Sequence, residues 1–202
     1  WYEGNITGDV ATAYIRYEEH NFEIGAYTIH AYVYDAAGNL SQRGLACNPT
    51  IPGKCGDGLE WILTTFGTLN IHGTGDMDNY ARLENNYSPW HNYSASIKEV
   101  IIEHGVTSIG TDAFYWCENL KKVSIADSVT SIGANSFSGC TSLTGIEIPD
   151  SVTSIKDWAF WGCNGLTSIT MPDSVTSVGV GAFEYCTGLI SAVISEIGRA
   201  HV

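Results

Sequence analysis

The most constraining feature of this 202-residue chain is an uninterrupted repeat of 23 residues. Four copies follow one another without a gap over 106–128, 129–151, 152–174 and 175–197. A unit of this length is too small to bury its own apolar face, so successive copies must stack on one another. The side chains that recur at fixed positions are Phe114, Phe137, Phe160 and Phe183, then Cys117, Cys140, Cys163 and Cys186, and finally Leu120, Leu143, Leu166 and Leu189.

Each copy contains the pattern L-x-x-I-x-I, as in Leu143, Ile146 and Ile148. Apolar residues two positions apart face the same side of a strand, so the pattern predicts one short strand per turn in a parallel ladder. Ile97, Val100 and Ile102 lie one period earlier and add a fifth rung. The expected fold class is therefore mainly β, with short helical or irregular turns, in a leucine-rich-repeat solenoid.

The remaining segments suggest how the chain is divided. We expect residues 56–105 to form an N-terminal β cap with the first rung, including a hairpin from 59–65 and 67–72, and residues 106–195 to form the four repeats. Residues 46–55 contain Pro and Gly and are interpreted as a linker. Residues 196–202 break the pattern and are interpreted as a non-native tail. Residues 1–45 alternate apolar and polar side chains, which is typical of antiparallel β structure.

The unit V-T-S-I-G-x-x-A-F-x-x-C-x-x-L-x-x-I-x-I-P-D-S resembles the BspA-like, or Treponema-type, leucine-rich repeat of bacterial surface proteins. The lead-in at 55–100 is similar to the segment that commonly precedes such repeats. Residues 1–45 resemble the carboxyl half of the GBS Bsp-like module, an immunoglobulin-like β-sandwich found in wall-associated proteins. These resemblances imply an extracellular protein at the cell surface or cell wall of a Gram-positive bacterium, with a role in adhesion.

Composition argues against several other classes of function. The chain has 22 acidic and 9 basic side chains and a formal charge of −13, so it lacks the cationic surface that nucleic acids or anionic lipids require. No segment of the sequence is apolar enough to read as a membrane span. The sequence has no G-x-S-x-G, P-loop, H-E-x-x-H or G-x-G-x-x-G motif, so we expect neither an enzyme nor a cofactor.

The cysteines and one set of aspartates allow more than one interpretation. Stacking places the four repeat cysteines in a line, whereas zinc requires four ligands in a tetrahedron, so buried free thiols are favoured. Cys47 and Cys55 flank a loop that a disulfide would close in an oxidising compartment. Asp127, Asp150 and Asp173 follow the predicted strands, where they either bind calcium or only begin turns.

Outward positions of the predicted strands vary from copy to copy, whereas inward positions repeat. This contrast is typical of a recognition face on a fixed scaffold. The candidate binding residues on the strands are Glu99, Lys122, Ser124, Glu147, Ser168, Thr170 and Ser191. Trp158 and Trp161 depart from the repeat template, either to stack on a glycan or partner protein or to cover the core.

The expected partner is an extracellular protein of the host matrix or of a bacterial surface, or a glycan. The alternative is a wall-targeting or glycan-binding accessory module of a peptidoglycan hydrolase, since GBS Bsp-like modules resemble parts that accompany such enzymes.

Overall fold

The computed structural model describes residues 33–34, 40–41 and 50–194 of a chain that divides into two compact units, 1–47 and 48–202. In the first unit, β1 (Val33–Tyr34) pairs with β2 (Leu40–Ser41) in antiparallel fashion. The rest of the expected β-sandwich module and the tail at 196–202 lie outside the described residues.

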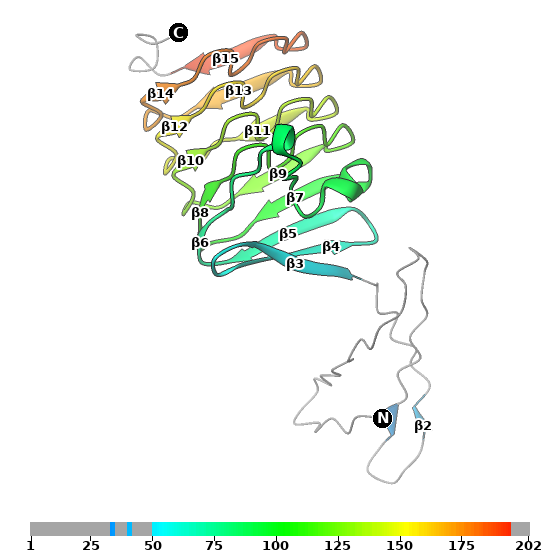
Figure 1. Ribbon diagram of the computed structural model, residues 1–202. Helices are drawn as coiled ribbons and strands as arrows, with labels where there is room; N and C mark the ends of the chain where they lie inside the picture. Colours follow the sequence, from blue (N-terminus) through cyan, green and yellow to red (C-terminus); the bar gives the residue numbers. More distant parts are fainter. Residues whose placement is uncertain (1–32, 35–39, 42–49, 195–202) are drawn as a thin grey trace. The chain divides into compact units, whose positions relative to one another are not determined.

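The second unit is a β-solenoid whose turns each contribute one strand to a front side and one strand to a back side (Figure 1). The front strands are β7 (Glu99–Ile102), β9 (Lys122–Ile125), β11 (Gly145–Glu147), β13 (Ser168–Met171) and β15 (Ser191–Ile194). The back strands are β6 (Gly75–Asp76), β8 (Val106–Ile109), β10 (Ser131–Ile132), β12 (Ser154–Ile155) and β14 (Ser177–Val178). Paired repeat strands are 23 residues apart, as Glu99 and Lys122 or Ser131 and Ser154 are. The back strands form one sheet, whereas the front strands divide into two sheets, because β9 and β11 lie side by side without strand pairing.

The prediction of one strand per turn was therefore incomplete. The V-T-S-I segment that opens each copy forms the second, back strand, which from β10 onward is only two residues long. So short a segment shows no alternation of apolar and polar residues from which a strand is inferred.

The cap contains the predicted hairpin, formed by β4 (Leu59–Thr64) and β5 (Thr68–Gly73), and one strand more. β3 (Thr50–Gly56) pairs with β4, so the expected linker at 46–55 is corrected: its residues 50–55 belong to the sheet. The reason is that Cys55 is buried and Ile51 packs against the core. β5 in turn pairs in parallel with β7, so the cap continues directly into the front ladder.

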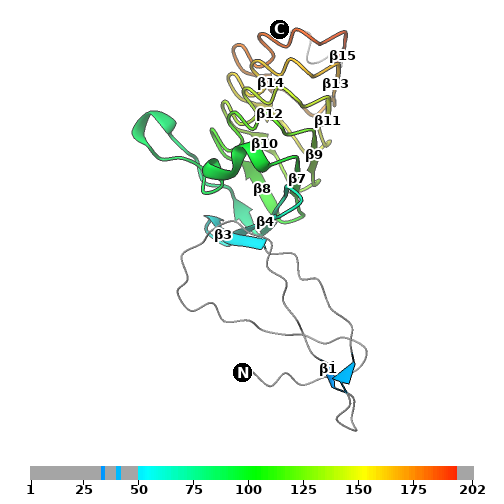
Figure 2. The same ribbon diagram turned by 90° about the vertical axis from the view of Figure 1, so that its right-hand side faces the viewer.

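Two 3-10 helices complete the cap, η1 (Arg82–Glu84) and η2 (His91–Ser96). Figure 2 shows the segment that carries η1 standing out from the solenoid. Within the described ranges, no helix has the length and apolar character needed to cross a membrane.

The repeated phenylalanines form one continuous stack inside the solenoid. Ring centroids are 5.1 Å apart between Phe114 and Phe137, 5.3 Å between Phe137 and Phe160, and 5.3 Å between Phe160 and Phe183. The first three rings are fully buried, as are Leu120, Leu143 and Leu166. The cap ends the stack with Trp90, whose ring lies 5.4 Å from that of Phe114.

Side-chain hydrogen bonds join each turn to the turn before it. The thiol of Cys163 lies 3.2 Å from the carbonyl oxygen of Phe137, and the Cys140 thiol makes the same contact with Phe114 at 3.3 Å. On the back strands' side, the hydroxyl of Thr153 donates to the carbonyl of Thr130 at 3.3 Å. The buried thiols of Cys140 and Cys163 thus pack the core and also satisfy main-chain groups of the neighbouring turn, whereas Thr153 makes its bond at the surface.

At one core position, a buried polar group has no hydrogen-bond partner. Ser136 is fully buried and its hydroxyl has no hydrogen-bond partner, whereas the other turns carry Ala113, Ala159 and Ala182 at the same position. We expect Ser136→Ala to raise the free energy of unfolding by about 1 kcal/mol, because an unpaired buried hydroxyl is removed. Urea unfolding followed by circular dichroism measures this change. The reverse substitution Ala159→Ser should lower the free energy of unfolding. If both variants changed the free energy of unfolding in the same direction, this explanation would be wrong.

Candidate functional site

The front face, defined as the outward side of β7, β9, β11, β13 and β15, carries the strand residues predicted to bind. Alternation along each strand turns Val100, Val123 and Ile146 inward, where they are buried. The candidates on the same strands point away from the core, partly exposed at Glu99 and exposed at Lys122, Ser124, Glu147, Ser168, Thr170 and Ser191. The structure thus brings these seven residues onto one surface, and their role in binding stays a prediction.

Charge on the front face is partly neutralised. The Nζ of Lys122 lies 2.8 Å from Oε1 of Glu99 on the neighbouring rung, at the cap end of the face. Because Lys122 is largely exposed to solvent and Glu99 partly so, the contribution of this pair to stability is small. Further from the cap the predicted residues are mostly hydroxyl-bearing. The face therefore offers shape and hydrogen bonds more than net charge.

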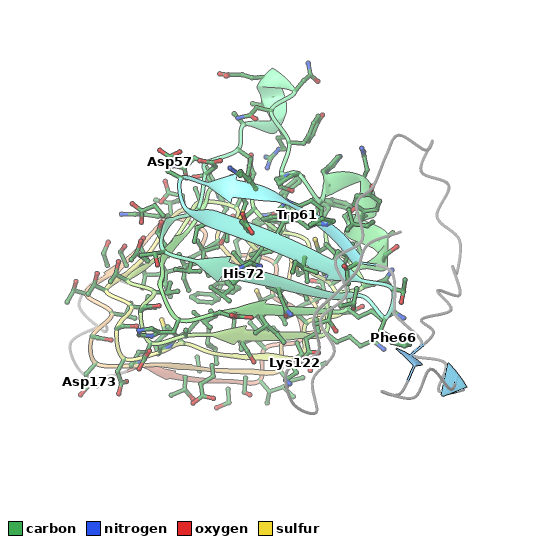
Figure 3. All side chains as sticks on the ribbon, turned by 90° about the horizontal axis from the view of Figure 1, so that it is seen from below. Asp57, Trp61, Phe66, His72, Lys122 and Asp173 are labelled. Atoms are coloured by element: carbon green, nitrogen blue, oxygen red, sulfur yellow. The ribbon has the colours of Figure 1, made fainter. Side chains whose placement is uncertain are left out.

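The same surface extends onto the cap strands β4 and β5, for which the sequence analysis predicted no binding residues. Asn70 of β5 stands between Ile62 of β4 and Ile101 of β7 in the strand register. All three are partly exposed on the outward side, and the Asn70 Oδ1 has no hydrogen-bond partner. The sequence could have indicated these outward residues, because polar and apolar side chains alternate in T-L-N-I-H-G at 68–73. Figure 3 shows Lys122 and His72 from the cap side, with Phe66 and Asp173 toward opposite ends of the strands.

Trp158 and Trp161 lie elsewhere, in the turn between β12 and β13. Trp158 is exposed and Trp161 is partly buried, with its ring in an edge-to-face contact at 5.3 Å with Tyr185. The predicted site residues therefore divide between strands and turns.

The cysteines of the repeats are free thiols, buried at Cys117, Cys140 and Cys163 and partly buried at Cys186. Burial raises the pKa of Cys117 to about 12, and it raises the pKa of Cys140 well above the usual value. Both thiols are therefore protonated at neutral pH and pack as small apolar groups. Burial also raises the pKa of Cys55 to about 12. Its predicted disulfide partner, Cys47, lies outside the described residues, so that pairing stays a prediction.

Asp127, Asp150 and Asp173 are exposed in the turns that follow the front strands. Asp127 lies 3.0 Å from Nδ1 of His104, and both side chains are largely open to solvent. Among the described residues, no group of three or more His, Cys, Asp or Glu is placed to hold a metal ion.

Comparison with known proteins places this architecture among repeat proteins. A leucine-rich repeat protein from Eubacterium ventriosum is similar in structure, with a TM-score of 0.59 and 28% identity over 75% of this chain and 45% of that chain. One from Bacteroides ovatus has a TM-score of 0.51 and 28% identity over 62% and 36%. The T. pallidum leucine-rich repeat protein shares the fold, with a TM-score of 0.53 and 23% identity over 67% and 68%. No curated protein matches.

This chain spans less than half the length of the E. ventriosum and B. ovatus proteins. The family model described as the BspA type leucine rich repeat region matches residues 89–199, more than half of the chain, in six copies. The sequence analysis had counted four complete repeats and one preceding rung within this range. With its stacked phenylalanines, its ladders spaced by 23 residues and this match, the chain belongs to the BspA-type leucine-rich repeat family.

Proposed function

We propose that this chain is a non-catalytic binding protein of the bacterial cell surface, and that its front face binds a protein ligand of the host matrix or of another bacterium. The observation that carries the proposal is the contrast on the front strands: inward residues repeat, whereas outward residues change from rung to rung. In such an arrangement, the repeated inward residues fix the scaffold and the variable outward residues determine which ligand binds.

The dimensions of the front face suit a protein partner. Five parallel strands at a spacing of about 4.8 Å give a surface about 19 Å wide. A stable complex buries about 800 Å² on each partner, so the ligand would cover these rungs and the adjoining cap strands β4 and β5. Since the strands are held by main-chain ladders, little conformational entropy is lost on binding.

An extracellular location, at the wall of a Gram-positive bacterium, is part of this proposal. It is supported by membership of the BspA-type family and by the resemblance of residues 1–45 to a GBS Bsp-like module.

Two arginine substitutions on the front face test the proposal. Immobilised fibronectin, laminin, fibrinogen and collagen, and intact bacterial cells, are the probes, and binding of the whole chain is measured by surface plasmon resonance or by pull-down. We expect wild type to bind at least one probe and Ser168→Arg/Thr170→Arg to weaken that binding by about tenfold or more, equivalent to about 1.4 kcal/mol. Both positions are exposed, so folding should be preserved.

The matched control is Ser177→Arg, which places the same charge on an exposed position of the back strand β14. It should bind as wild type does. Failure of wild type to bind any probe, or equal loss in the control, would contradict a front-face site.

A further inference from the structure

Every repeat places two residues of its turn in the left-handed region of backbone conformation. The first occurs at Asp112, Asn135, Trp158 and Gly181, and the second at Trp116, Gly139, Gly162 and Tyr185, all with φ between 50° and 75°. Gly, Asn and Asp adopt this conformation readily, whereas a bulky side chain does so at an energetic cost. Three of the eight positions nevertheless carry large aromatics, namely Trp116, Trp158 and Tyr185.

These aromatics are not placed there to fill the core. The exposed fraction is 47% for Trp116, 43% for Trp158 and 60% for Tyr185. A bulky residue that combines unfavourable backbone with wide exposure points to a role in binding, because strain of this kind is retained where function requires it.

The two indoles are seated on glycines of the following turn. A Cβ atom at Gly139 would come within 3.0 Å of the Trp116 ring, and one at Gly181 within 2.6 Å of the Trp158 ring. Each ring thus rests against main chain that lies one repeat further along, which holds it in place while part of it faces solvent. Such rings are pre-ordered platforms, so little rotamer entropy is lost when a ligand stacks on them.

A small cleft lined by polar and aromatic side chains lies next to the Trp116 platform at the cap end. The Arg82 guanidinium lies 3.9 Å above the Tyr115 ring and pairs with Asp112 Oδ1 at 2.8 Å. Tyr87, stacked on His91 at 4.2 Å, also lines the cleft. The Tyr115 ring lies 6.1 Å from that of Trp116, so the cleft adjoins the first platform.

We propose that this turn side is a second binding surface, for a neutral glycan, in which Trp116, Trp158 and Tyr185 stack on sugar rings and Arg82 and Asp112 bind hydroxyl groups.

The chemistry of the surface favours this ligand over others. A sugar ring presents a face of C–H groups to an aromatic plane and a rim of hydroxyls that both donate and accept hydrogen bonds, which suits a carboxylate beside a guanidinium. A polyanion is disfavoured, because the charge of Arg82 is already paired and the chain carries −13. Trp, Tyr and Arg are also common in protein hot spots, but there they cluster together at the centre of an interface. Here Asn135, Gly139 and Gly162 interrupt the aromatics at the same repeat positions.

The experiment replaces the three aromatics together in the whole chain. Trp116→Asn/Trp158→Asn/Tyr185→Asn uses the residue that the second turn already carries in this conformation at Asn135. The probes are a glycan array and soluble mannan, xylan and β-glucan, with heparin as the anionic comparison. We expect wild type to bind at least one neutral glycan and not heparin, and the triple variant to bind it at least tenfold more weakly with an unchanged circular dichroism spectrum.

Two control variants keep the result interpretable. Asn135→Gly, which changes a left-handed residue without removing an aromatic, should bind as wild type does, and so should the front-face variant Ser168→Arg/Thr170→Arg. Should the triple variant unfold, each single substitution is expected to reduce affinity on its own. The proposal is overturned if wild type binds no neutral glycan, if it binds heparin alone, if the folded triple variant binds normally, or if sedimentation shows that these aromatics join two copies of the chain. Because the front-face site is tested separately, failure of one proposal leaves the other standing.

Discussion

Phe160→Ala is expected to lower the free energy of unfolding by about 3–5 kcal/mol, the usual cost of truncating a fully buried aromatic. The Phe160 ring has no exposed surface and is stacked between Phe137 and Phe183 at 5.3 Å on each side. Removing it therefore leaves a cavity between two turns and abolishes two ring contacts. Urea unfolding followed by circular dichroism measures the loss.

Phe183→Ala is the matched control for this prediction. Phe183 is only partly buried and has one stacked neighbour among the described residues, Phe160. Its truncation should cost clearly less than that of Phe160. A change below about 1 kcal/mol for Phe160→Ala would mean that the phenylalanine stack does not hold the turns together.

Trp90→Ala is the second substitution with a large expected effect, again about 3–5 kcal/mol. The indole is fully buried, stacks on Phe114 and donates a hydrogen bond from Nε1 to the Ala113 carbonyl at 2.7 Å. It also makes edge-to-face contacts with Trp61 at 5.8 Å and Tyr80 at 6.1 Å. One side chain thus connects the cap sheet to the first repeat, so its loss weakens both.

Trp90→Phe separates the two contributions of the indole. It keeps an aromatic ring over Phe114 but leaves the Ala113 carbonyl without its buried donor, a cost of about 1–3 kcal/mol. We therefore expect an intermediate stability in thermal and urea unfolding. If Trp90→Phe were as unstable as Trp90→Ala, ring stacking would contribute little, and the junction would depend on the hydrogen bond alone.

Much of the repeat region could be predicted from the 23-residue period. A fixed step places Phe137 beside Phe114 and Phe160 whatever the details of the turn, and the two-residue spacing of Ile146 and Ile148 indicates which side chains face inward. Features outside the period were missed for physical reasons. Trp90 ends the phenylalanine stack from 24 positions before Phe114 rather than 23. β3 contains Pro52 and Gly53, which normally argue against a strand, and Pro52 is tolerated because β3 is an edge strand.

The candidate site was predicted in part. Alternation along the front strands correctly indicated which side chains turn outward, since period two is a property of any strand. The left-handed turn positions were not inferred, although Gly139 and Gly162 recur one repeat apart. An aromatic residue at such a position hides the pattern, because Trp and Tyr are the residue types least expected there.

The thiol and hydroxyl bonds between turns have a consequence for how genes of this kind change. The second, third and fourth copies contact their predecessors through the same atoms, as Cys140, Cys163 and Cys186 each reach a phenylalanine carbonyl 26 residues earlier. Unequal recombination that duplicates or removes one whole copy would therefore recreate a matching junction. An insertion or deletion of any other length would place the cysteine thiol opposite a different main-chain group. The solenoid can then gain or lose whole repeats during evolution, which changes its exposed surfaces while the fold is preserved.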